Sequence, residues 1–295
     1  MAIFNKGIGE WINISPREKI NQIGSVYYGN RIILNRHRNG DKYSLDTGNS
    51  WKNYPSLGDV EKGAANVNPI FLNYDAFQMV LISKVDPEKG SLANRYGLYK
   101  TNLKEDRPTW KEIYRLPNHL NSQRTRIKIL GNEKTEEIYI FSYPDIINSD
   151  KDAEDVVSIN HRLYLSRNKG KKFHEIALPP IKKVWGVKSY DSGFVMKVEL
   201  ENKEGKSLIW YLSKNKEWRF VDLKKDLDSW HPVKDYVIST DLNNNILKID
   251  PSGSIKEVLY LGNNSKNIKQ SSHLAIAGEE IFLSSYTIWK LKNKL

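Results

Sequence analysis

The sequence contains no cysteine in its 295 residues. Disulfide bonds, thiolate metal sites and a cysteine nucleophile are therefore excluded. It also lacks any run long and apolar enough to form a transmembrane helix. Its first fifteen residues lack the basic-then-apolar pattern of a signal peptide. We expect a protein without a transmembrane segment, periplasmic or secreted if a signal has been removed and cytoplasmic otherwise.

The short motifs of several catalytic and cofactor sites are also missing. The six histidines show no close metal-ligand spacing, and there is no glycine-rich phosphate loop and no G-x-S-x-G phrase. The stretch Asp241–Asn245 begins like a calcium loop, but Ser252 stands where the twelfth-position acid belongs. We therefore predict no metal and no other cofactor.

The composition that remains is that of a globular β protein. Hydrophobic residues make up 39% and charged residues 27%, and there are eight Trp, sixteen Tyr and eight Phe. Aromatic residues favour the half-buried surface of a pleated sheet. The net charge of +11 favours an anionic partner. Because no compact Lys/Arg tract concentrates this charge, a nucleic-acid partner is not favoured.

A short phrase recurs along the chain, each time between two runs of alternating apolar and polar residues. The fullest copy is Ser44-Leu45-Asp46-Thr47-Gly48-Asn49-Ser50-Trp51, and a looser copy is Ser166–Phe173. The aromatic or apolar residues that close the copies are Trp11, Trp51, Trp110, Phe173, Trp218 and Ile255. Spacings of about 40–50 residues with several short strands each are typical of β-propeller blades.

The two ends of the chain predict how the ring of blades closes. The last segment supplies three strands, at 272–277, 280–284 and 287–292, whereas the N-terminus begins with an unmatched strand at 10–14. Pairing the two would protect an open strand edge. We therefore predict an all-β fold, a six-bladed β-propeller with the N-terminal strand closing the last blade, in one domain over residues 1–295. Five or seven blades remain alternatives because 239–261 is a thin blade.

The fullest copy resembles the Asp box, the bacterial neuraminidase repeat S-x-D-x-G-x-[ST]-W of sialidase-like propellers. It matches at Ser44, Asp46, Gly48, Ser50 and Trp51, whereas in the second copy Asn168 replaces the acid. The resemblance implies that these residues maintain the fold, on the face opposite the usual binding site. The residues assigned to this structural motif are Ser44, Asp46, Gly48, Trp51, Ser166, Asn168, Gly170 and Phe173.

This sequence lacks the catalytic pattern of the sialidases. The family has an early F/Y-R-I-P phrase whose arginine grips a carboxylate, but the first predicted blade reads Ile23–Tyr28 without it. Arg31 precedes Ile32 and Ile33, yet no proline follows. We therefore assign no catalytic residue.

Loops on the opposite face are the expected place for a binding site, since loops on a rigid scaffold carry function. The residues predicted to bind there are Arg36, His37, Arg38, Arg95, Tyr96, Arg124, Arg126, Trp230 and His231. Arg with aromatic residues suits recognition of a protein or an anion. We expect a non-catalytic propeller that binds a protein partner, possibly an acidic one, as an assembly factor or a bacterial toxin-neutralising protein. The alternative is a glycan-binding or sialidase-like glycoside hydrolase propeller.

Trp185 and Trp210 lie in strand runs and are predicted to be core.

Overall fold

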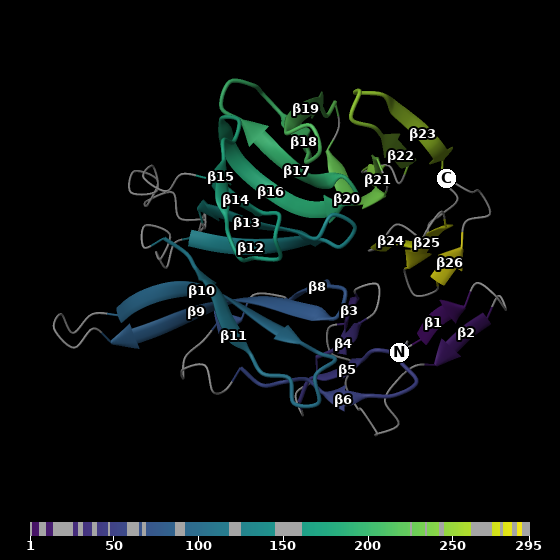
Figure 1. Ribbon diagram of the computed structural model, residues 1–295. Coiled ribbons are helices and arrows are strands. Elements are labelled where there is room, and N and C mark those ends of the chain that lie inside the picture. Colours follow the sequence, from purple (N-terminus) through teal and green to yellow (C-terminus); the bar gives the residue numbers. More distant parts are fainter. Residues whose placement is uncertain are drawn as a thin grey trace. The chain divides into compact units, whose positions relative to one another are not determined.

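The computed structural model describes residues 2–5, 10–13, 26–28, 32–36, 40–46, 48–57, 65–66, 69–85, 92–117, 125–144, 161–224, 226–233, 235–241, 245–260, 273–277, 280–284 and 288–290. Every regular element in these ranges is a β-strand (Figure 1). The all-β prediction is confirmed. The chain divides into two compact units, Met1–Ile176 and Ala177–Leu295.

The first unit holds four antiparallel sheets. A two-stranded sheet pairs β1 (Ala2–Asn5) with β2 (Glu10–Asn13). The next sheet has the order β3 (Val26–Tyr28), β4 (Ile33–Asn35), β5 (Lys42–Ser44), β6 (Lys52–Asn53). A five-stranded sheet contains β7 (Ala65–Asn66), β8 (Ile70–Leu72), β9 (Asp75–Val85), β10 (Leu92–Asn102) and β11 (Lys111–Arg115). The last has the order β12 (Thr125–Asn132), β13 (Glu137–Pro144), β14 (Arg162–Ser166), β15 (His174–Ile176).

The second unit holds three antiparallel sheets. The first has the order β16 (Ile181–Tyr190), β17 (Gly193–Leu200), β18 (Lys206–Leu212), β19 (Glu217–Asp222). The second has the order β20 (Leu227–Val233), β21 (Tyr236–Asp241), β22 (Asn245–Ile249), β23 (Ile255–Tyr260). The third contains β24 (His273–Ala277), β25 (Glu280–Ser284) and β26 (Ile288–Lys290).

The sheets confirm the β-propeller class and correct the blade count. A blade is an antiparallel sheet in which each strand pairs with the next, and five sheets have the four or more strands of a complete blade. The recurring phrase joins the last two strands of each: β5–β6, β10–β11, β14–β15, β18–β19 and β22–β23. The described residues therefore form five blades rather than six. That 1–295 makes one propeller domain stays a prediction.

The prediction that the N-terminal strand closes the last blade is wrong for the described residues. β2 pairs with β1, with Trp11 opposite Phe4, and the sheet of β24–β26 has three strands. A hairpin between neighbours in sequence costs less loop-closure entropy than pairing with the far end of the chain. Within the described ranges no pairing joins β2 to β26, and the sheet of β24–β26 stays one strand short of a complete blade.

Side-chain hydrogen bonds hold the turn at the fullest copy of the phrase. The Asp46 carboxylate accepts hydrogen bonds from the backbone N–H of Ser50 at 2.8 Å and from its hydroxyl at 2.6 Å. Gly48 takes the positive φ of 94° that glycine tolerates best, and its N–H donates to Ser44 Oγ at 2.8 Å. Trp51 Nε1 donates to the Gly48 carbonyl at 3.0 Å.

The second copy of the phrase repeats this turn. Asn168 Oδ1 accepts from the Lys172 N–H at 2.9 Å, and the Gly170 N–H donates to Ser166 Oγ at 2.9 Å. Phe173 packs at 4.4 Å, centroid to centroid, on Tyr114. Both turns are local structure, and membership of the Asp-box family stays a prediction.

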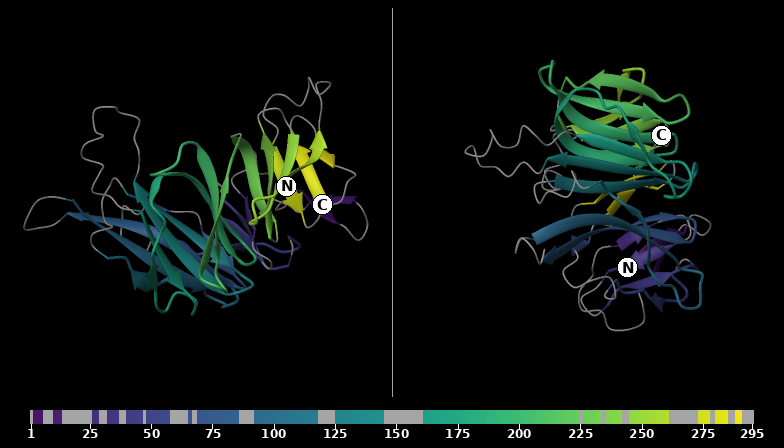
Figure 2. Two further views of the ribbon diagram at one scale, coloured as in Figure 1. Left: turned by 90° about the horizontal axis from the view of Figure 1, so that it is seen from above. Right: turned by 60° about the vertical axis from the view of Figure 1, so that its left-hand side comes forward.

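The core of the second unit lies between its first two blades and positions the site described below. Leu208 and Trp210 of β18 pack there with Leu227 and Trp230 of β20 and Val237 of β21. These blades are neighbours in both views of Figure 2 and in Figure 1. The prediction that Trp210 is core is confirmed, since only 1% of it is exposed.

Candidate functional site: an exposed tryptophan beside a lysine–aspartate network

The first strand of the second unit contains two irregularities that separate it from an ordinary propeller strand. Ile181 pairs with Leu200 and Lys183 with Glu199, so Lys182 is an extra residue in β16. The register shifts again between Val184 and Gly186, which makes Trp185 a second extra residue. Such bulges re-aim side chains and are frequent beside active sites. Both extra residues are exposed.

Trp185 is the central residue of this surface. It is 45% exposed, which corrects the prediction that it belongs to the core. Its indole Nε1 donates a hydrogen bond to Glu199 Oε1 at 3.1 Å. The ammonium groups of Lys183 and Lys206 lie 4.0 Å and 4.1 Å from the ring centroid. Both distances are within the range of cation–π attraction.

Strand register explains why these three polar partners meet. Lys183 of β16 lies opposite Glu199 of β17, which lies opposite Lys206 of β18. Directly opposite residues share one face of an antiparallel sheet. The row of alternating charge crosses the blade near the β17–β18 turn, and the bulge brings Trp185 against it. We call Lys183, Trp185, Glu199 and Lys206 the Trp185 surface.

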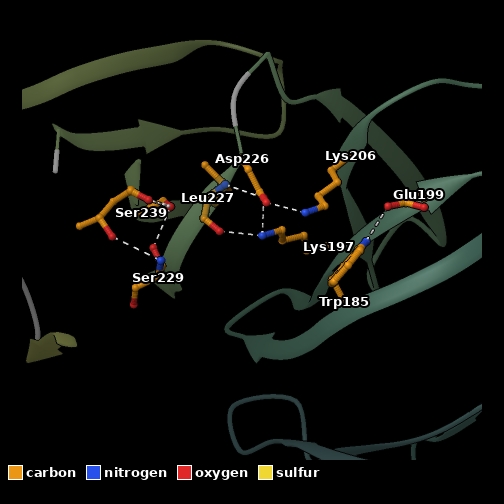
Figure 3. A network of polar contacts seen from close by, with 9 residues as sticks. Trp185, Lys197, Glu199, Lys206, Asp226, Leu227, Ser229 and Ser239 are labelled. Carbon is orange, nitrogen blue, oxygen red and sulfur yellow. Dashed lines mark hydrogen bonds and ion pairs between the residues drawn. The ribbon is translucent and has the colours of Figure 1, made fainter. Parts of the chain in front are cut away.

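A partly buried ion-pair network continues from this surface toward the second blade (Figure 3). Asp226, just before β20, is bonded to Lys197 Nζ at 2.6 Å through Oδ1 and to Lys206 Nζ through Oδ2. Lys197 is buried and also donates to the Leu227 carbonyl at 2.6 Å. Two ammonium groups therefore share one carboxylate, which leaves a local excess of positive charge.

The lysines decide the protonation state of Asp226. Partial burial raises the pKa of its carboxyl group, but the hydrogen bonds and charges of Lys197 and Lys206 outweigh that effect. The net pKa is lower than usual, so Asp226 is ionised at neutral pH. Lys206 thus contacts an aromatic ring and a carboxylate at the same time.

An open hollow adjoins the Trp185 surface. Its volume is about 650 Å³. The residues that line it are Lys182, Glu199, Leu200, Glu201, Asn202, Lys203, Glu204 and Gly205. Lys203 is held there by Asp222, with Nζ 2.9 Å from Oδ2. The hollow offers carboxylates, an amide and ammonium groups, which together can bind hydroxyl and carboxylate groups of a ligand.

Several of the residues predicted to bind in loops have partners within the first unit. Arg36 pairs with Asp41 at 3.0 Å, and Arg95 makes two hydrogen bonds to Glu112, at 3.0 Å and 3.1 Å. Tyr96 is buried in β10. Arg126 lies in β12 with an exposed side chain, and it too interacts with another group. His37, Arg38 and Arg124 lie outside the described residues.

Trp230 and His231, expected in a loop between blades, lie in strand β20. Trp230 is 7% exposed and packs in the core of the second unit, where its ring lies under the Lys188 ammonium. Burial, reinforced by the charge of Lys188, lowers the pKa of His231 to about 4. The structure brings these two residues together but does not place them on the Trp185 surface. Their role in binding stays a prediction.

Two features common in other proteins are not found among the described residues. No group of three or more His, Asp or Glu side chains there is arranged to hold a metal ion. In the same ranges no helix has the length and hydrophobicity needed to cross a membrane.

The chain matches no known family model, and no curated protein is similar to it in sequence. Solved structures are similar in fold. An oligogalacturonate lyase in complex with manganese is matched with a TM-score of 0.55 at 8% identity, over 86% of this chain and 70% of that one. The oligogalacturonate lyase of Vibrio parahaemolyticus gives 0.53 at 8% identity, over 86% and 71%. A puromycin hydrolase gives 0.57 at 8% identity, over 88% of this chain but only 41% of that one.

These structures correct the expected function. We expected a non-catalytic propeller that binds a protein partner. The similar structures are instead β-propeller proteins that are enzymes, namely oligogalacturonate lyases and a puromycin hydrolase. At 8% identity the likeness establishes the fold, the β-propeller.

Proposed function

We propose that this protein is a carbohydrate-active β-propeller that takes an acidic oligosaccharide as its substrate and binds it at the Trp185 surface. The observation that carries the proposal is an exposed indole, aimed outward by a strand bulge, with two ammonium groups about 4 Å from its ring. The ring is 45% exposed and can be reached from solvent.

Each part of this surface matches a part of such a ligand. The apolar C–H face of a sugar ring can pack on the indole once a lysine side chain over the ring moves aside, which buries apolar area on the sugar and on the indole. Lys183 and Lys206 supply charge for a carboxylate, and Glu199 and Asn202 supply acceptors and a donor for hydroxyl groups. The net charge of +11 favours the approach of an anion.

The fold comparison supports the same substrate class. Both matched lyases are named for oligogalacturonate, a chain of uronic acids, and this protein spans 70% and 71% of their lengths. The puromycin hydrolase is spanned over 41% only, so its activity is not carried over. The proposal therefore names an acidic oligosaccharide and no reaction step through a metal.

The first experiment is a calorimetric titration that measures the affinity of the protein for trigalacturonate. We expect binding that weakens at least tenfold in Trp185→Ala, which corresponds to about 1.4 kcal/mol. Phe220→Ala is the matched control, because Phe220 is an equally exposed aromatic residue of the same blade, at 45%. A glutamate oligomer of the same charge tests whether the sugar ring is needed. Equal binding of that peptide, or equal losses in both variants, would refute the proposal.

The second experiment tests turnover. Incubation with oligogalacturonate should give shorter products, with new ultraviolet absorbance if the bond is broken by elimination and new reducing ends alone if it is broken by hydrolysis. Trp185→Ala should lower the rate at limiting substrate, whereas Phe220→Ala should keep it. An unchanged oligosaccharide after prolonged incubation would contradict the enzymatic part of the proposal.

A further inference from the structure

Lys206 occupies an unusual position, because two groups compete for its charge. Its ammonium lies 4.1 Å from the Trp185 ring centroid and is bonded to the Asp226 carboxylate. The side chain is 21% exposed and that of Asp226 is 38% exposed, so both can be reached from solvent. Lys183, on the same ring, forms no ion pair among the described residues.

We infer that Lys206 is the residue that distinguishes a carboxylate from a neutral group on the ligand, and that Asp226 is its built-in competitor. This inference rests on the proposed function. In the free protein Asp226 occupies the ammonium that the ligand carboxylate needs. Binding an acid therefore requires Lys206 to exchange one carboxylate for another, and affinity is held below the value that a free lysine would give.

Lys197 makes the exchange feasible. It bonds to the other oxygen of Asp226 at 2.6 Å and to the Leu227 carbonyl at 2.6 Å. When Lys206 turns to the ligand, Asp226 keeps a buried cationic partner and is not left as an isolated charge, which would be the costly outcome. A neutral sugar does not draw Lys206 away, so Asp226 does not oppose its binding.

The test compares trigalacturonate with its methyl ester, which has the same rings without the charge. Asp226→Asn should raise affinity for the acid about fivefold, because Lys206 is released, and should leave affinity for the ester unchanged. Glu136→Gln is the matched control. It makes the same charge change by releasing Lys169 from a 2.8 Å ion pair in the first unit, and it should alter neither affinity.

A second variant approaches the same contact from the other side. Lys206→Met should lower the ratio of acid to ester affinity, although Lys183 still lies on the Trp185 ring. With thermal unfolding as a folding check, this variant keeps the test valid if Asp226→Asn is unstable. Lys104→Met is its control, since Lys104 also lies over an aromatic ring, Tyr74, at 3.8 Å. Weaker binding of the acid by Asp226→Asn, or an unchanged ratio of acid to ester affinity in Lys206→Met, would overturn this inference and leave the proposed function standing. Failure of the unaltered protein to bind either probe would overturn the proposed function itself.

Discussion

Replacement of Gly193 by alanine should destabilise the blade that carries the Trp185 surface. Gly193 begins β17, at a φ of 155°, and an added Cβ would lie 2.0 Å from the carbonyl oxygen of Tyr211. That oxygen belongs to β18, the neighbouring strand. Since no real Cβ approaches a backbone atom so closely, β17 and β18 would have to separate at this point.

The expected magnitude combines two effects. A backbone conformation that only glycine adopts readily costs of order 1–3 kcal/mol for another residue. Overpacking in a well-packed region costs typically about 1–3 kcal/mol more. We therefore expect Gly193→Ala to lower the free energy of unfolding by about 2–6 kcal/mol, a large part of the stability of an ordinary domain.

Gly253→Ala separates the two effects. Gly253 has a positive φ of 96°, but no atom lies within 4 Å of the position that an added methyl group would take, so only the backbone effect applies. Urea unfolding followed by tryptophan fluorescence measures both variants. Gly193→Ala should be the less stable by about 1–3 kcal/mol. Equal stability of the two variants would refute the assigned clash with Tyr211.

Two further predictions concern pH and the turn motif. The pKa of His231 is lowered to about 4, so the unfolded chain takes up a proton below pH ~6.5 while the folded protein does not. Stability should therefore fall as pH drops from about 6.5 to about 4, and His231→Gln should reduce that slope in urea unfolding; parallel curves would contradict this. Asn168→Asp should stabilise the protein by several tenths to about 1 kcal/mol at neutral pH, because a carboxylate would accept the Lys172 N–H bond as Asp46 does in its own turn. Thermal unfolding checks it, and a lower melting temperature would count against the shared role of the two turns.

Local features of the fold could be predicted from the sequence, and long-range ones less well. The strand pairs on either side of the recurring phrase were predictable because alternation and a turn residue such as Gly170 act within a few positions. The blade count was not, because it depended on a pairing between the two ends of the chain. The sequence of Glu10–Asn13 suits any strand partner, and nothing in it favours β26 over the nearby β1.

The predicted binding residues show a similar limit. Arg36 and Arg95 are charged residues in predicted loops, yet each has a carboxylate partner in the structure. The partner of Arg95 is Glu112, which is distant in sequence and becomes a neighbour only through the pairing of β10 with β11. Sequence reasoning counts charges but does not pair them across strands.

Trp185 was missed for a physical reason that the sequence does contain. Strict alternation backward from Val187, which is 2% exposed, places Trp185 on the same buried face. One extra residue in the strand changes that face, since a shift of a single position turns every side chain over. The stretch Lys182-Lys183-Val184-Trp185-Gly186 breaks alternation twice, with two adjacent lysines and a tryptophan next to a glycine. Those two breaks coincide with the two register shifts in β16. Interrupted alternation in this strand therefore marks the position at which Trp185 turns to the solvent, although its apolar character indicates core.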